Sequence, residues 1–308
     1  MRPTEDDTSP IGNEKDRPLL RYGKLLLKAA VTALLVWLVF RKVDFRETAR
    51  IFSESRPGWL LAALAVYFSS LLLSTHRSML FLSDVGIRLD YPSNLRLYLL
   101  GGVYNIVLPG GIGGDGYKIL VLNRSSGTPY RDILTAFLLE RVSGLWAIGF
   151  WLVAMGFFVP LPFIGPWQLA LAFVAGTAIY RYAVKRFFPR HADRWVHRHA
   201  ASIGVQGLVM GSVSCLLLSQ GLWKGQLPYL FAFQSSTVLS VLNIGLSGLG
   251  VREFAMSYAS DVLKTSASLS VFAASSFWLL SLVAVLPGLY FLYRGDSAFG
   301  RRDEGPVP

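Results

Sequence analysis

The sequence has little charge and almost no cysteine. Only 16% of its 308 residues are charged, whereas 53% are hydrophobic, and a water-soluble domain usually carries about 25% charged residues. The low charge content excludes most classes of soluble globular protein. Cys215 is the only cysteine. Because one cysteine cannot close a bridge within the chain, a secreted scaffold held together by disulfides is excluded as well.

Patterns that would indicate catalysis or a cofactor are also scarce. The string Gly111-Ile-Gly-Gly-Asp-Gly116 matches a dinucleotide-binding fingerprint, but no strand precedes it. His191, His197 and His199 lie among arginines with only Asp193 nearby, which favours a basic interfacial segment over a metal site. No nucleophile, base and orienting group can be recognised together. We therefore expect no enzymatic activity, no cofactor and no bound metal.

The charge that is present is mostly positive. The chain has 30 Lys and Arg against 19 Asp and Glu, a net charge of +11. These residues gather between long uncharged stretches, which indicates loops held against an anionic cytoplasmic leaflet. We expect no nucleic acid partner.

Several uncharged runs reach the length of about 20 apolar residues that a membrane crossing needs. They predict about six spanning helices: one in 22–40, one in 57–75, two in 142–180 separated by the prolines at 160–166, one in 200–223 and one in 265–293. Two further runs, 97–114 and 225–251, are broken by Gly and Pro. Broken backbone at membrane depth must be enclosed by protein or line a water-filled cavity. These two runs are predicted to be re-entrant helical hairpins in an all-α, polytopic membrane protein.

The distribution of basic residues predicts the orientation. Cytoplasmic loops carry an excess of Lys and Arg, and loops 76–96, 115–131 and 181–199 are strongly basic. We therefore expect both termini in the cytoplasm, with polar tails 1–20 and 294–308 enclosing one transmembrane domain, 21–293. Segment 41–56 fits less well, since its five arginines and lysines would face outward.

The broken runs share a pattern. Asn105-Ile-Val-Leu-Pro-Gly110 aligns without a gap with Asn243-Ile-Gly-Leu-Ser-Gly248, and an acid follows at the same offset, Asp115 or Glu253. The separation is 138 residues and predicts two halves, about 22–159 and 160–293. With the orientation above, the halves would be inverted copies, an arrangement typical of alternating-access transporters.

Charged residues in or beside apolar sequence are the candidate site. At membrane depth such residues are usually paired or face a cavity. One interpretation is a head-group site, in which Gly-rich turns offer backbone N–H groups and arginines hold a phosphate. The alternative is that the charges form salt bridges that pin hairpins to helices. The candidate head-group residues are Asn105, Pro109, Gly110, Gly113, Asp115, Lys118, Glu140, Arg141, Asn243, Gly248, Gly250, Arg252 and Glu253.

Three segments stand out in order along the chain: Asn105 to Asp115, Leu139-Glu-Arg-Val-Ser-Gly144 and Gly248-Leu-Gly-Val-Arg-Glu253. Together they resemble the signatures of the lysylphosphatidylglycerol synthase transmembrane-region, or flippase-like, family, and the resemblance covers roughly residues 20–293. It implies an integral inner-membrane protein that moves a lipid between leaflets, with Asp115, Glu140, Arg141, Arg252 and Glu253 around a central site. Because the chain ends shortly after Tyr293, we expect it to lack the aminoacyl-transferring domain of two-part members.

The leading hypothesis is a non-enzymatic lipid flippase whose partner is a membrane lipid. Without a nucleotide-binding motif, transport would run downhill or be coupled to an ion, with Asp115 or Glu253 as a proton carrier. A non-transporting scaffold subunit of lipid or glycan biosynthesis, docked through loop 181–199, is the alternative. A membrane-embedded lipid-modifying enzyme is a weaker third hypothesis. Coupling to a proton or ion and assembly into a homo-oligomer stay open.

Overall fold

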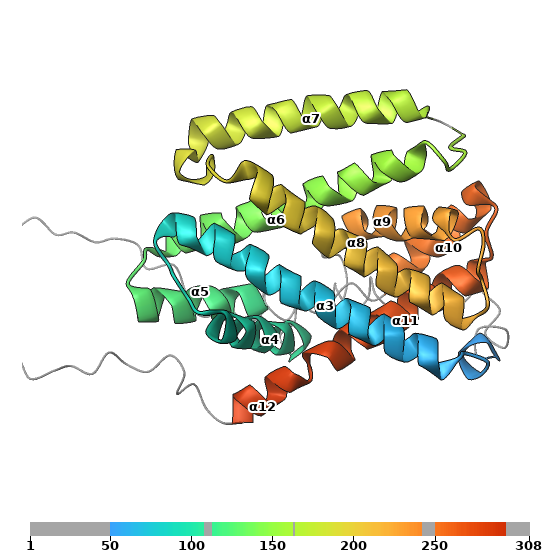
Figure 1. Ribbon diagram of the computed structural model, residues 1–308, viewed down its shortest axis with the longest axis horizontal. Helices are drawn as coiled ribbons and strands as arrows, with labels where there is room; N and C mark the ends of the chain where they lie inside the picture. Colours follow the sequence, from blue (N-terminus) through green and yellow to red (C-terminus); the bar gives the residue numbers. More distant parts are fainter. Residues whose placement is uncertain (1–49, 108–112, 163, 242–249, 294–308) are drawn as a thin grey trace, which may run out of the picture.

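The computed structural model describes residues 50–107, 113–162, 164–241 and 250–293, and every regular element within these ranges is a helix. The predicted all-α class is therefore confirmed. In chain order the elements are α3 (Pro57–Leu82), η1 (Ser83–Val85), α4 (Tyr91–Val107), α5 (Gly113–Ser126), α6 (Tyr130–Gly156), α7 (Pro166–Phe187), η2 (Pro189–His191), α8 (Trp195–Ser219), α9 (Leu227–Val241), α10 (Val251–Leu263), α11 (Ala267–Val285) and α12 (Pro287–Tyr293) (Figure 1).

Four stretches in the described part of the chain are long and apolar enough to cross a membrane. They are α3 with η1, α6, α8, and α11 continued by α12. The predicted division of 142–180 is confirmed, because α6 ends at Gly156 and α7 begins at Pro166. The expected α7 span is not among the four: its apolar stretch is shortened by Gln168 and Arg181. The expected span at 22–40 lies outside the described residues.

Each broken run separates two helices that pack against each other. Helices α4 and α5 flank residues 108–112, and α9 and α10 flank residues 242–249. Figure 1 shows α4 beside α5 and α9 beside α10. Both helices of the first pair extend beyond the predicted run, since α4 begins at Tyr91 and α5 ends at Ser126. Whether either pair returns to the side of the membrane from which it enters stays a prediction.

The order of the helices repeats along the chain. Helix α3 begins at residue 57 and α8 at residue 195, which is 138 residues later. The starts of α4 and α9 differ by 136 residues, those of α5 and α10 by 138, and those of α6 and α11 by 137. The structure thus shows equivalent helices at the spacing of the sequence motifs. That the halves are inverted copies stays a prediction.

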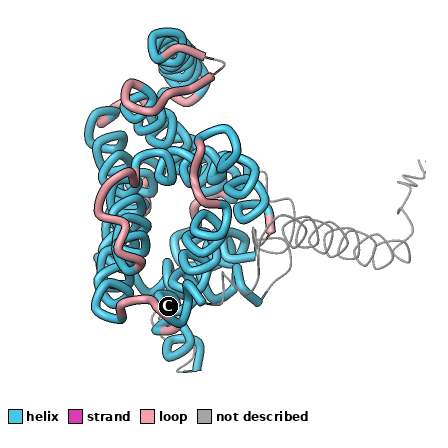
Figure 2. Tube along the Cα trace, turned by 90° about the vertical axis from the view of Figure 1, so that its right-hand side faces the viewer, coloured by secondary structure: helices cyan, strands magenta, loops and turns pink. Residues whose placement is uncertain are grey.

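The equivalent helices α3 and α8 form the most extensive helix contact of the described residues and lie side by side (Figure 1). Ser212 Oγ donates a hydrogen bond to the Ala63 carbonyl at 2.9 Å. A Cβ on Gly211 would lie 3.3 Å from Val66, so a side chain there would require Val66 to shift slightly. In the end-on view of Figure 2 the helices surround a central axis, with α7 at one edge.

Two apolar clusters lie toward opposite ends of α3. Ala63 belongs to a cluster with Val213 of α8 and Phe272 of α11. Phe81 belongs to another, with Leu122 of α5 and Ile133 of α6. Between them, Leu71 of α3 packs against Ala284 and Val285 in a smaller apolar cluster.

Candidate functional site

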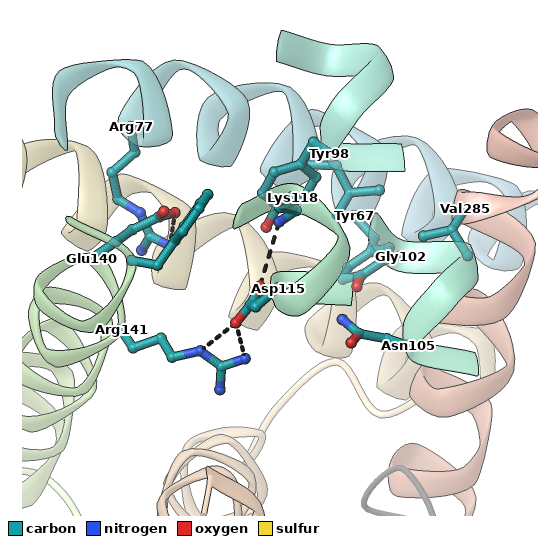
Figure 3. Close-up of a pocket in the computed structure, with 12 residues that line it drawn as sticks. Tyr67, Arg77, Tyr98, Gly102, Asn105, Asp115, Lys118, Glu140, Arg141 and Val285 are labelled. Atoms are coloured by element: carbon teal, nitrogen blue, oxygen red, sulfur yellow. Dashed lines mark hydrogen bonds and ion pairs between the residues drawn. The ribbon is translucent and has the colours of Figure 1, made fainter. Parts of the chain in front are cut away.

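Two adjoining cavities occupy the middle of the bundle. The first, of about 300 Å³, is bounded mainly by α3, α4, α5 and α6, and is drawn in Figure 3. The second, of about 260 Å³, is bounded by α3, α6, α8, α9, α10 and α11 together with Tyr98 of α4. Five residues line both cavities and connect them: Tyr67, Leu71, Arg77, Tyr98 and Arg141.

The cavities lie near mid-height of three candidate spans. Their lining on α3 runs from Tyr67 to Arg77, which is about 15 to 30 Å along a helix about 39 Å long, at 1.5 Å per residue. Lining residues of α6 run from Phe137 to Ile148, and those of α8 from Val205 to Val209. Both stretches contain the midpoint of their helix. The polar lining is therefore expected near the middle of the membrane.

Glu140 of α6 pairs with Arg77, an arginine that the sequence pattern predicted to lie in a loop. Arg77 Nη2 lies 3.1 Å from Glu140 Oε1, and the two side chains are 10% and 9% exposed. The sequence prediction put Arg77 in the cytoplasmic loop 76–96 because the uncharged run ends at Thr75. This is wrong: α3 continues to Leu82, since neither Gly nor Pro interrupts it before Gly86. The positive charge is tolerated in the helix because a carboxylate neutralises it.

Asp115 joins α5 to α6. It lies in the first turn of α5, where a carboxylate also complements the helix dipole. Arg141 Nε donates to Asp115 Oδ2 at 2.8 Å, and Arg141 Nη2 contacts the same oxygen (Figure 3). Lys118 Nζ lies 3.7 Å from Asp115 Oδ1 and 4.4 Å from the centre of the Tyr98 ring. One carboxylate therefore organises two cations at the wall of the first cavity.

Asn105 and Gly114 fasten the two helices of the first broken run. The Gly114 N–H donates to Asn105 Oδ1 at 2.9 Å, which caps the start of α5. A Cβ on Gly114 would lie 2.0 Å from the Gly101 carbonyl oxygen, so only glycine fits where the α4 and α5 backbones meet. The glycine-rich motif thus has a packing role at this end of the cavity, and Asn105 also lines the cavity itself.

Arg252, the second residue of α10, lines the second cavity. Its guanidinium carbon lies 5.0 Å from the ring centre of Phe233 and 5.1 Å from that of Phe277, distances at which the aromatic faces attract the cation. The buried Nε has no hydrogen-bond partner. Among the described residues no ion pair includes Arg252. Two rings therefore hold a cation whose charge no carboxylate neutralises directly.

Gly250 and Glu253 shape the helix start that presents Arg252. Gly250 has a φ of +84°, a conformation that glycine adopts without steric cost. Its N–H donates to Glu253 Oε2 at 2.8 Å, so the carboxylate caps the first turn of α10. Glu253 is 6% exposed and lies outside both linings. The carboxylate therefore shapes the helix start that presents Arg252 and also places a negative charge near it.

The structure brings together most of the charged candidates. Asn105, Asp115, Lys118, Glu140, Arg141 and Arg252 line the cavities, whereas Gly113, Gly250 and Glu253 do not. Pro109, Gly110, Asn243 and Gly248 lie outside the described residues.

Sequence reasoning missed Arg77, Tyr67 and Tyr98 as lining residues. A signal existed for Tyr67, because a tyrosine in the middle of an apolar run does not fit the usual place of this residue at the ends of spans. Tyr98 lies at the start of the run 97–114, so its position gave no such signal.

The lining is suited to binding a polar group in an apolar surrounding. It offers guanidinium, ammonium and carboxylate groups together with tyrosine hydroxyls. Within the described ranges no three His, Cys, Asp or Glu side chains lie close enough to hold a metal ion.

Comparison with curated proteins gives no match to this chain. The family model of the lysylphosphatidylglycerol synthase transmembrane region matches residues 25–288, a range that contains every lining residue of both cavities. Four of the described helical stretches can cross a membrane. The chain is thus a multi-pass membrane protein, and it belongs to the lysylphosphatidylglycerol synthase transmembrane-region family.

Proposed function

We propose that this protein moves a phospholipid or glycolipid between the leaflets of the cell's inner membrane, with the lipid head group passing through the two central cavities. The observation that carries the proposal is the charged lining at mid-height of three candidate spans. A charge at the bilayer centre costs about 2.5 to 3.5 kcal/mol on insertion scales. A cluster of such residues around a cavity is best explained by a polar group that must cross there.

The arginines supply the chemistry for a phosphate. A guanidinium presents parallel N–H groups that match two phosphate oxygens. Arg141 lines both cavities, and Arg252 lines the second, so a phosphate could be passed between them along a short polar route. Glu140 keeps Arg77 in place, and Asp115 keeps Lys118 and Arg141 in place.

The rest of the transport cycle follows from the same proposal. The protein acts as a transporter and not as an enzyme, with both termini in the cytoplasm, and the two halves rock about the shared cavities. Of the two acids considered for proton coupling, only Asp115 lines a cavity, so it is the better candidate.

The test is leaflet-resolved lipid movement in liposomes that contain the purified protein. A phospholipid labelled on its acyl chain is added to both leaflets, and an impermeant reductant destroys the outer label. Wild type should expose nearly all of the label. Arg252→Ala should slow the movement by about tenfold or more, since a hydrogen bond to a charged group contributes about 1.5 to 3 kcal/mol.

The matched control is Lys224→Ala, which removes an exposed cation outside both linings and should leave the rate unchanged. Label movement no faster than in protein-free liposomes would overturn the proposal. Equal rates for wild type and Arg252→Ala would remove Arg252 from the pathway.

A further inference from the structure

We infer that the head group taken by the central cavities carries a net negative charge, as in a phosphodiester bearing an uncharged hydroxylated group, and that a cationic aminoacylated head group is disfavoured. The inference rests on the proposed function and specifies its substrate class. It concerns the balance of charge around the cavities, which the family membership does not determine.

The described lining contains more cations than anions. Four cationic side chains line the two cavities: Arg77, Lys118, Arg141 and Arg252. Only two carboxylates do so, Asp115 and Glu140. The internal segments 108–112, 163 and 242–249 contain no Asp, Glu, Lys or Arg, so they cannot change this balance. Glu253 adds one negative charge near Arg252 from outside the linings, so among the described residues an excess of positive charge remains around the two cavities, which an anion would neutralise.

Both carboxylates already have cationic partners. Glu140 pairs with Arg77 at 3.1 Å, and Asp115 contacts Arg141 and also Lys118 at 3.7 Å. An ammonium group entering with the lipid would have to displace one of these cations and leave it unpaired in an apolar surrounding, which is unfavourable. An aminoacylated head group consequently has no free carboxylate to meet in the described lining.

Arg252, by contrast, is suited to binding an anion. It forms no ion pair among the described residues, its Nε is buried without a partner, and two aromatic rings hold it in place. The carboxylate of its neighbour Glu253 accepts a hydrogen bond from the Gly250 N–H. A phosphodiester in the second cavity would supply the counter-charge that this guanidinium lacks in an ion pair.

Neutral polar side chains share the second cavity with Arg252. Ser74, Gln206 and Thr237 line the same cavity and carry hydroxyl or amide groups. Such groups can donate to or accept from the hydroxyl groups of a glycerol or sugar moiety. The second cavity thus combines one cation for the phosphate with uncharged partners for the rest of the head group.

The test measures lipid binding to the purified full chain in detergent, by competition against a fluorescent short-chain phosphatidylglycerol. The competitors are dioctanoyl phosphatidylglycerol, its lysyl ester and dioctanoyl phosphatidylcholine. We expect the anionic lipid to bind about tenfold more tightly than the other two, the ratio expected when one charge-assisted contact is lost. In Arg252→Ala this advantage should fall to about twofold or less, and Arg252→Lys should retain part of it.

Equal or tighter binding of the lysyl ester by wild type would overturn the inference, and this comparison requires no variant to fold. An undiminished preference in a folded Arg252→Ala would overturn the role of Arg252. The proposed function fails separately: anionic preference in binding without any lipid movement in liposomes would support the inference and contradict transport. Equal movement of phosphatidylglycerol and its lysyl ester would support transport and contradict the inference.

Discussion

At the scale of single residues, the charged lining side chains divide into those that form ion pairs and Arg252, which forms none among the described residues. The Arg77–Glu140 pair links α3 to α6 and is almost completely buried. Removing one member of such a pair is costly because its partner stays buried and charged. Arg252 has no such partner among the described residues, so its substitution should affect a ligand more than the fold.

Replacing Glu140 tests the buried pair. Glu140→Ala should lower the free energy of unfolding by about 3 to 5 kcal/mol, because Arg77 loses its counter-charge in an apolar surrounding. The double variant Arg77→Met with Glu140→Leu should recover most of the loss, since apolar side chains of similar volume remove both charges. Unfolding by SDS in mixed micelles measures the difference.

The control is Asp132→Asn, which breaks an ion pair with Arg190, a side chain that is 72% exposed. Exposed pairs contribute about 0 to 1 kcal/mol, so this variant should remain close to wild type. If Glu140→Ala costs no more than Asp132→Asn, the buried pair does not stabilise the bundle.

The sequence located most of the charged lining, because Asp115, Glu140, Arg141 and Arg252 stand out beside apolar runs. It could not assign partners. Arg141 pairs with Asp115 and not with its neighbour Glu140, since adjacent residues on a helix point in different directions. The same limit hid Arg77, whose burial depends on a carboxylate 63 residues away in sequence.

At the scale of elements, the glycine-rich motif acts first as a packing device. Helices α4 and α5 touch through Gly101 and Gly114, and Asn105 caps α5 across the break. This contact fixes the first turn of α5, from which Asp115 reaches Arg141. Packing at the motif and charge placement at the cavity are therefore coupled.

Two glycines in the same turn of α5 allow the effect of helix packing to be distinguished from the effect of helix propensity. Gly114→Ala should destabilise the protein and slow lipid movement, because its Cβ would lie 2.0 Å from the Gly101 carbonyl oxygen and must push the helices apart. Gly116→Ala is the matched control: nothing lies within 4 Å of its Cβ, and alanine favours a helix by about 0.5 to 1 kcal/mol over glycine.

Thermal unfolding midpoints in detergent measure both variants. Gly114→Ala should fall below wild type and Gly116→Ala should equal or exceed it. Similar midpoints for the two variants would contradict the close contact of α4 and α5.

The ends of helices could be predicted where prolines terminate them. They were harder to predict where the only signal was the end of an uncharged run. The division between α6 and α7 follows from Pro160, Pro162 and Pro166. By contrast α3 and α8 extend beyond the uncharged runs, because ion pairs neutralise Arg77 and Arg198 inside the bundle. A scan for uncharged residues therefore underestimates helices that carry paired charges.

At the scale of the whole molecule, two sets of equivalent helices enclose the cavities. The 138-residue offset in the motifs anticipated the order of the helices, but it could not show that α3 and α8 would pack against each other. That contact depends on side chains distant in sequence, such as Ser212 and Ala63. The exposed apolar residues of α7, including Leu171, Val174 and Ile179, fit a helix that faces lipid.

The orientation can be checked by labelling single cysteines. In a Cys215→Ser background, Lys185→Cys and Lys224→Cys place thiols at exposed positions on either side of α8. The excess of basic residues near Lys185 predicts that this side of α8 faces the cytoplasm. An impermeant maleimide should therefore label the Lys224→Cys variant in intact cells, and the Lys185→Cys variant only after permeabilisation. Labelling of both in intact cells would mean that α8 does not cross the membrane, and the reverse pattern would invert the orientation.

The central claim is that a lipid head group occupies the cavities at mid-height of the bundle, and photocrosslinking tests it most directly. A phospholipid with a diazirine on its head group is reconstituted with the protein, and the sample is irradiated. The adducts are then mapped by mass spectrometry. We predict adducts on the lining stretches of α3 and α6 and at the start of α10, reduced in Arg252→Ala. Adducts confined to outward-facing residues such as those of α7, unchanged by Arg252→Ala, would contradict the account.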